Sequence, residues 1–103
     1  MKLFTLTLLA AGSIGVLSAA DAQAGKAVYD KSCKMCHGVD GKGNPAIAKA
    51  LNVTLKPLGS AEVQAKSDAD LKKDSTQGTG KMKPVKLSDA QAADVVSYLR
   101  TLK

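Results

Sequence analysis

The sequence predicts an all-α fold in a single domain, and two observations support that prediction. Near the carboxyl end, apolar side chains recur at the three- and four-residue spacing of one helix face; they are Ala92, Val95, Val96, Leu99 and Leu102. Elsewhere, apolar residues fall in short groups between glycine, proline and asparagine, and no stretch alternates as a half-buried strand does. No internal repeat or low-complexity segment indicates a second domain.

The first predicted helix runs from Gly25 to about Met35. A second begins after Asn44, whose side chain is a favourable N-cap, with Pro45 at the first helical position. Its apolar side consists of Ala46, Ile47, Ala50 and Leu51. These features predict a short helix soon after the first.

Two more helices are predicted in the second half of the chain. The stretch Ser67–Asp70 is typical of a helix start with acidic residues in the first turn, and Gly78 and Gly80 indicate the end of that helix. The stretch Ser88–Gln91 is a capping box that precedes the apolar spacing described above. The last helix therefore has the strongest support.

Both cysteines and the only histidine lie within five positions, in the stretch SCKMCHG. On one helical turn, Cys33, Cys36 and His37 project from the same side. C-x-x-C-H is the attachment signature of c-type haem, because two thiols at this spacing can bond the macrocycle while the imidazole binds iron. A redox-active dithiol needs no adjacent histidine, and a structural zinc site would need a fourth ligand.

The composition agrees with a cofactor at the centre of the fold. The chain has 103 residues, no tryptophan and one phenylalanine, Phe4, which lies near the amino end. Only Tyr29 and Tyr98 supply large rings elsewhere. Because domains of this size have marginal cores, a covalently held porphyrin would supply the missing apolar surface.

The amino end is typical of a secretory signal peptide. Lys2 gives a positive start, residues 3–17 are apolar, and residues 18–24 are rich in small side chains. The alternative is a membrane anchor, but the apolar run is shorter than the ~20 residues that span a bilayer. We expect a signal peptide over 1–22 and one haem domain over 23–103, with cleavage after Ala20 or Ala24 as alternatives.

Export implies the periplasm, with no stable membrane insertion after cleavage. Thiols in that compartment ordinarily oxidise to disulfides, so a maturation route that captures both cysteines with haem is implied.

The opposite face of the iron has one candidate ligand. His37 is the only histidine, Met1 would leave with the signal peptide, and Met35 lies inside the attachment loop. Met82 remains, in the stretch GTGKMKP. A methionine that only fills a gap is the usual alternative, but elimination favours ligation because methionine is a known axial ligand of haem iron.

The chain resembles the small class I c-type cytochromes, of the monohaem, bacterial periplasmic type. The matching positions, in order, are Gly25, Tyr29, Cys33, Cys36, His37, Gly38, Met82, Tyr98 and Leu99. The resemblance implies a cytochrome c-like fold of three to four helices wrapped around one covalently attached haem. It also implies that His37 and Met82 are the axial ligands.

Further details follow from that resemblance. The first and last helices should cross at Gly25, with Tyr29 and Tyr98 packed around the crossing, and the Pro45 carbonyl should accept the other N–H of His37. Two departures from the family pattern stand out. Lys83 separates Met82 from Pro84, and an apolar residue is usual where Asp74 and Ser75 stand, which favours a shorter or shifted third helix.

With both axial positions filled, the iron can change charge but has no vacancy for a substrate, so the sequence predicts an electron carrier rather than an enzyme. Two other roles stay open. A sensor would exchange Met82 for a gas such as CO or NO, and a redox subunit would stay bound to a larger enzyme. We expect a monomer.

The charge balance bears on the partners. Fifteen basic and nine acidic residues give a net charge of +6. Lys81, Lys83 and Lys86 flank the proposed ligand, and Lys34 lies within the attachment loop. This predicts redox partners with acidic docking surfaces, against the alternative of an ordinary solvated surface. Nucleic acid is a poor alternative, because the chain is exported and lacks aromatic stacking residues.

Overall fold

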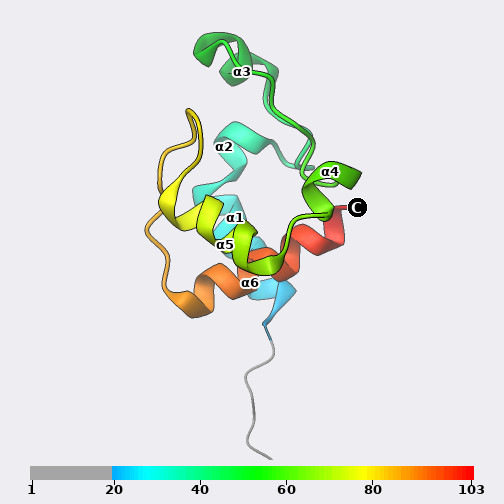
Figure 1. The fold of residues 1–103 in the computed structure, drawn as a ribbon, viewed down its shortest axis with the longest axis vertical. Coiled ribbons are helices and arrows are strands. Elements are labelled where there is room, and N and C mark those ends of the chain that lie inside the picture. The colour runs from blue at the N-terminus through cyan, green and yellow to red at the C-terminus, as the bar shows by residue number, and fades with distance from the viewer. Residues whose placement is uncertain (1–19) are drawn as a thin grey trace, which may run out of the picture.

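The computed structural model describes residues 20–103 as helices joined by turns and loops (Figure 1). The elements are α1 (Ala22–Ser32), α2 (Lys34–His37), α3 (Pro45–Leu51), α4 (Ala61–Gln64), α5 (Asp68–Gln77), α6 (Asp89–Leu99) and the 3₁₀ helix η1 (Arg100–Leu102). Extended pairing in this range is limited to an isolated bridge between Thr79 and Met82. The expected signal peptide falls almost entirely on residues 1–19, outside the described residues.

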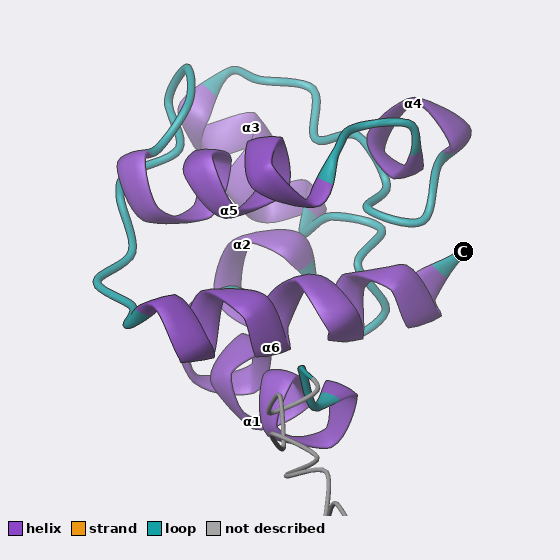
Figure 2. Ribbon diagram, turned by 60° about the horizontal axis from the view of Figure 1, so that its bottom comes forward, coloured by secondary structure: helices purple, strands orange, loops and turns teal. Residues whose placement is uncertain are grey.

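The core lies where α1 crosses α6 (Figure 2). Tyr29 on α1 is fully buried against Val95 and Leu99 of α6. The ring of Tyr29 lies 5.1 Å from that of Tyr98, tilted by 56°. Gly25 permits the close approach, because a Cβ atom built there would lie 1.9 Å from the Asp94 carbonyl oxygen. The predicted crossing is therefore confirmed.

The boundaries of the first helix differ from the prediction. α1 begins three residues earlier, because the Asp21 carboxylate caps it by accepting the Gln23 N–H at 2.8 Å. The helix also stops earlier, since Cys33 adopts a non-helical φ of −120°, with ψ of −31°, before α2 begins. The expected single helix is therefore two helices with a bend at Cys33.

α3 has the predicted start and cap. The Asn44 side chain accepts the Ala46 N–H at 3.0 Å, and Pro45 occupies the first position. None of its residues is buried, and Leu51 is 41% exposed. The apolar side of α3 therefore lacks the helix-to-helix packing that its sequence suggests.

α5 is a full ten-residue helix, not a shortened one. Ser75 is buried, and its hydroxyl donates to the Leu71 carbonyl at 2.9 Å. This bond satisfies the hydroxyl within the helix. Asp74 instead accepts from the Lys66 ammonium at 2.6 Å. The start at Ser67 and the end at Gly78 agree with the prediction.

α6 begins as predicted. Ser88 accepts the Gln91 N–H at 3.1 Å, and the Gln91 side chain accepts the Ser88 N–H at 2.9 Å, which completes the capping box. Its buried residues are Ala92, Val95, Val96 and Leu99, all of which the spacing identified.

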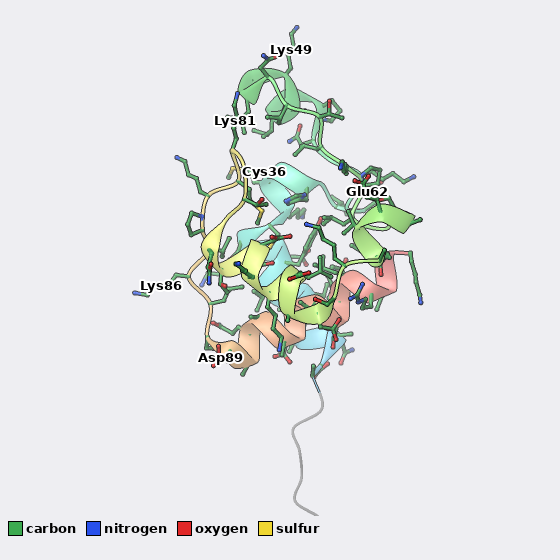
Figure 3. The ribbon with its side chains drawn as sticks, viewed as in Figure 1. Cys36, Lys49, Glu62, Lys81, Lys86 and Asp89 are labelled. Carbon is green, nitrogen blue, oxygen red and sulfur yellow. The ribbon has the colours of Figure 1, made fainter. Side chains whose placement is uncertain are left out.

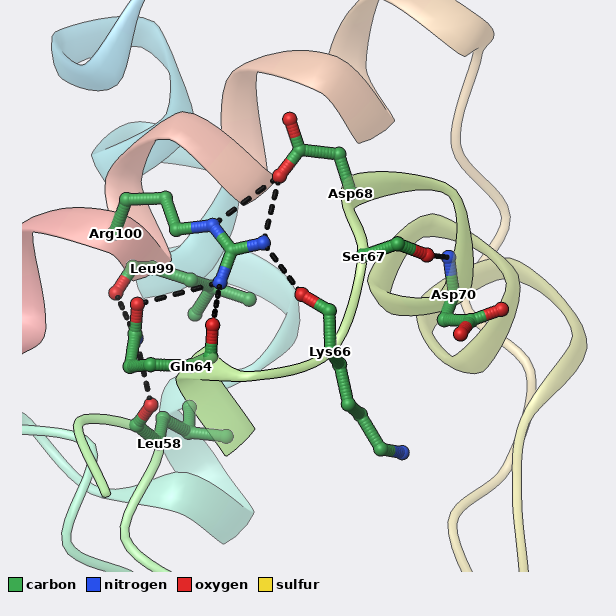
Figure 4. A network of polar contacts seen from close by, with 8 residues as sticks. All are labelled: Leu58, Gln64, Lys66, Ser67, Asp68, Asp70, Leu99 and Arg100. Carbon is green, nitrogen blue, oxygen red and sulfur yellow. Dashed lines mark hydrogen bonds and ion pairs between the residues drawn. The ribbon is translucent and has the colours of Figure 1, made fainter. Parts of the chain in front are cut away.

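A polar network around Arg100 fastens the unpredicted helix α4 and the start of α5 to the carboxyl end of α6 (Figure 4). The guanidinium donates to the Gln64 carbonyl at 2.8 Å and to the Asp68 carboxylate at 2.7 Å. The Gln64 side chain donates to the carbonyls of Leu58 and Leu99, each at 2.9 Å. This network holds residues 58–68 beside the last helix.

Candidate haem site

The attachment motif forms one helical turn after the bend at Cys33. The His37 N–H donates to the Cys33 carbonyl at 3.0 Å, so Cys33, Cys36 and His37 share one turn as the spacing predicted. All three are half-buried, and both thiols are free. Two thiols and an imidazole are therefore presented together.

Burial sets the protonation of this turn. It raises the pKa of the Cys33 thiol, and the nearby Cys36 raises it further. It lowers the pKa of His37, because the charged imidazolium loses hydration. His37 is therefore neutral at pH 7, which leaves a nitrogen lone pair for a metal.

The backbone after the motif holds α2 in place. The Gly43 N–H donates to the His37 carbonyl at 2.7 Å, and the Asn44 N–H donates to the Cys36 carbonyl at 2.9 Å. The Asn44 side chain also donates to the Met35 carbonyl at 3.1 Å. From α1, the Tyr29 hydroxyl donates to the Gly38 carbonyl at 2.6 Å.

One predicted contact is wrong. Nδ1 of His37 is buried and has no hydrogen-bond partner, so the bond expected from His37 to the Pro45 carbonyl is not formed. Pro45 is the first residue of α3, and a carbonyl at that position points along the helix axis toward later residues.

The residues of the motif fit a covalently attached haem. Two free thiols one turn apart supply the covalent attachment, and the neutral imidazole supplies the metal ligand. Within residues 20–103, no group of three or more His, Cys, Asp or Glu side chains is arranged to hold a metal ion by itself.

Met82 lies on the loop of residues 78–86 between α5 and α6 and is half-buried. Thr79 and Met82 exchange backbone bonds of 3.2 and 2.9 Å, which makes a tight turn. Gly78 has a φ of +78°, and a Cβ there would lie 2.5 Å from the Met82 carbonyl oxygen and 3.0 Å from the Pro84 nitrogen. Pro84 therefore packs against Gly78 although Lys83 is inserted before it.

The two methionines of the described chain differ in exposure. Met35 is 77% exposed, whereas Met82 is half-buried. The structure brings Cys33, Cys36 and His37 together and places Met82 on a separate element of the fold.

The sequence prediction missed several supporting contacts. The sequence indicates Asn44 only as a helix cap and Tyr29 only as a packing residue. Their bonds to the Met35 and Gly38 carbonyls each join residues nine positions apart. The sequence indicates Lys81 only as a surface charge, yet its ammonium donates to the Leu51 carbonyl 30 residues away. No local sequence pattern indicates such partners.

Within residues 20–103, no helix has the length and apolar character needed to span a membrane.

Comparison with known proteins gives consistent matches. Residues 22–103 match the family model described as cytochrome c. Cytochrome c-554(547) of Halothiobacillus neapolitanus is 35% identical, over 82% of this chain and 100% of that protein. Cytochrome c-555 of Chlorobaculum thiosulfatiphilum is 38% identical, over 77% of this chain and 93% of that protein.

A solved structure is also similar. The KustC0563 c-type cytochrome has a TM-score of 0.66 and 31% sequence identity, and the match covers 77% of this chain and 96% of that one.

Proposed function

This chain belongs to the cytochrome c family and is an electron-transfer protein with covalent haem c, and we propose on that basis that His37 and Met82 are its axial ligands. Cys33 and Cys36 hold the haem, which supplies a one-electron couple at its iron. The neutral imidazole of His37 would bind one side of the iron and the Met82 thioether the other. With both positions occupied, these residues leave no vacancy for a substrate.

The observation that supports Met82 is the contrast with Met35. Met35 is 77% exposed and lies within the attachment turn, while Met82 is half-buried on a loop fixed by Thr79 and Gly78. A histidine and methionine pair raises the reduction potential relative to harder ligand sets. The fixed loop keeps the Met82 thioether in place as the charge on the iron changes.

The ligation is tested by substituting each methionine in turn. Met82→Ala should abolish the methionine-to-iron charge-transfer band of the oxidised protein, lower the potential and open the reduced iron to CO. Met35→Leu is the matched control and should change none of these. Survival of the band in Met82→Ala would refute the assignment.

We also propose that partners dock through acidic surfaces onto the lysines near the Met82 loop. Lys34, Lys83 and Lys86 are exposed and take part in none of the ion pairs among residues 20–103. Figure 3 shows Lys86 pointing away from the loop between α5 and α6. The charges of these three lysines are therefore available to a partner. Attraction of this kind speeds encounter and weakens as the Debye length falls to about 10 Å at 0.1 M salt.

Charge reversal at two matched pairs tests this docking face. Reaction with an anionic oxidant should slow as salt rises, and reversing Lys83 and Lys86 to Glu should flatten that dependence. Reversing Lys72 and Lys73 on α5 changes the net charge equally and should flatten it less. Equal effects of the two pairs would mean that only net charge matters.

For the export of the chain, we propose cleavage between Ala20 and Asp21 rather than after Ala22. Cleavage after Ala22 would remove Asp21, whose carboxylate caps α1 and whose backbone nitrogen donates to the Asp94 carboxylate at 2.8 Å. Loss of such a cap costs about 1 kcal/mol. Cleavage after Ala20 keeps both contacts and places the new α-ammonium beside Asp94. The mature protein would be a periplasmic monomer.

A further inference from the structure

We propose that Lys81 is a positioning residue that holds the Met82 loop against the carboxyl end of α3 and so slows displacement of Met82 from the iron. The inference rests on the proposed ligation by Met82, and the experiments below separate the two.

The contact itself has favourable chemistry. The Lys81 ammonium donates to the Leu51 carbonyl at 2.6 Å. Leu51 is the last residue of α3, so its carbonyl has no partner within the helix. A cation at the negative end of a helix is also favoured by the aligned peptide dipoles, and hydrogen bonds from charged donors are stronger than neutral ones. Lys81 thus serves as a cap for a helix 30 residues away in sequence.

This contact has no substitute among the described hydrogen bonds. Within residues 20–103, it is the only hydrogen bond that joins the loop of residues 78–86 to residues 44–55. α3 has no buried residue that could anchor it by packing. Figure 3 shows Lys81 at the tip of the loop, reaching toward the helix that carries Lys49.

The contact also links the two sides of the proposed haem site. The segment before α3 is fastened to the attachment turn, through the bonds from Gly43 to His37 and from Asn44 to Cys36. Lys81 fastens the end of α3 to the loop that carries Met82. Loss of the Lys81 contact would free that loop from α3. The two backbone hydrogen bonds between Thr79 and Met82 would remain.

The experiment compares three variants of the holoprotein with the wild type. Lys81→Met removes the ammonium and keeps the length of the side chain, and Lys81→Arg retains a charged donor. Lys83→Met is the matched control. Lys83 follows Met82 as Lys81 precedes it, and its replacement removes the same charge. Unlike Lys81, however, Lys83 makes no hydrogen bond in the described structure. One measurement is the rate at which imidazole displaces methionine in the oxidised protein, followed by its charge-transfer band. The other is amide hydrogen exchange in α3.

Lys81→Met should raise both the imidazole displacement rate and the exchange rates at the end of α3 about 3- to 10-fold, which is the effect of losing one exposed hydrogen bond of ordinary net strength. Lys81→Arg should restore most of the difference, and Lys83→Met should match the wild type.

Three results would overturn the inference. Equal behaviour of Lys81→Met and Lys83→Met would show that the contact contributes nothing. Faster exchange in α3 with an unchanged displacement rate would show that Lys81 orders α3 without positioning Met82. If Lys81→Arg failed to restore the displacement rate, the hydrogen bond could not be the cause of the slow displacement in the wild type. A wild-type protein without the methionine band would instead refute the ligation, and the exchange in α3 would still report on the contact.

Discussion

Replacing Gly25 with alanine tests the helix crossing on which the fold depends. A Cβ atom at this position would lie 1.9 Å from the Asp94 carbonyl oxygen, whereas Cβ atoms essentially never approach a neighbour within 3.0 Å. α1 and α6 would therefore have to move apart by at least 1.1 Å, the difference between the 3.0 Å limit and the 1.9 Å distance. A gap of that size forfeits a quarter to a half of the dispersion attraction of the atoms lining it.

The cost follows from the residues at the crossing. Tyr29, Val95 and Leu99 form the buried cluster that α1 and α6 share. Overpacking typically costs about 1–3 kcal/mol, and here the obstacle is a backbone carbonyl, which cannot swing aside. Alanine returns about 1 kcal/mol through its better helix propensity. Because a backbone obstacle places the cost at the upper end of that range, we expect Gly25→Ala to lower the free energy of unfolding by about 2 kcal/mol.

Guanidinium unfolding of the holoprotein, followed by circular dichroism, measures this loss. Gly80→Ala is the control, because a Cβ there meets nothing within 4 Å and only the positive φ of 56° resists it, at a cost of about 1 kcal/mol. If Gly25→Ala were as stable as the wild type, or no worse than Gly80→Ala, the close approach of α1 and α6 would be wrong.

Three further predictions concern the cofactor, the buried tyrosine and the mature chain. The double variant Cys33→Ala, Cys36→Ala should give an apoprotein that is largely unfolded by circular dichroism, because the haem that it cannot attach supplies part of the apolar core. A well-folded apoprotein would contradict this prediction. Burial raises the pKa of Tyr29 from 10.0 to about 12. Between these two pH values, the Tyr29 hydroxyl therefore stays protonated in the folded protein and loses its proton in the unfolded chain. The contribution of Tyr29 to stability should therefore be constant below about pH 10 and fall as pH rises toward 12. In urea unfolding at several pH values, Tyr29→Phe should be less stable than the wild type near pH 8, and the difference should shrink above pH 10; a constant difference would exclude Tyr29 as the titrating group. Mass spectrometry of the exported protein should give a chain that begins at Asp21 and carries one haem, whereas a chain that lacks Asp21 would refute the proposed cleavage site.

The sequence was informative where a local rule determines the structure. The caps at Asn44, Ser67 and Ser88 each bond backbone groups two or three residues away, so their sequence patterns predicted three helix starts. The spacing of Cys33, Cys36 and His37 is equally local, and it predicted the attachment turn. These features need no knowledge of the tertiary structure.

The rest could not be predicted because it depends on contacts between distant residues. The start of α1 depends on Asp21, a residue that the signal-peptide pattern had assigned to the leader. The poor packing of α3 follows from its position in the fold, which its apolar residues do not reveal. Arg100 and Lys81 find partners more than 29 residues away, and the spacing of charges gives no indication of them. The missing partner of His37 Nδ1 is likewise a property of how the loop after the motif folds.

The most direct test of the proposed function is an optical redox titration of the purified wild-type holoprotein near neutral pH. If His37 and Met82 both bind the iron, the titration should follow a single one-electron curve. The oxidised form should then show the methionine-to-iron band, and the reduced form should not bind CO. A wild-type protein that lacks that band and binds CO readily when reduced would contradict the proposed ligation, and with it the assignment as a simple electron carrier.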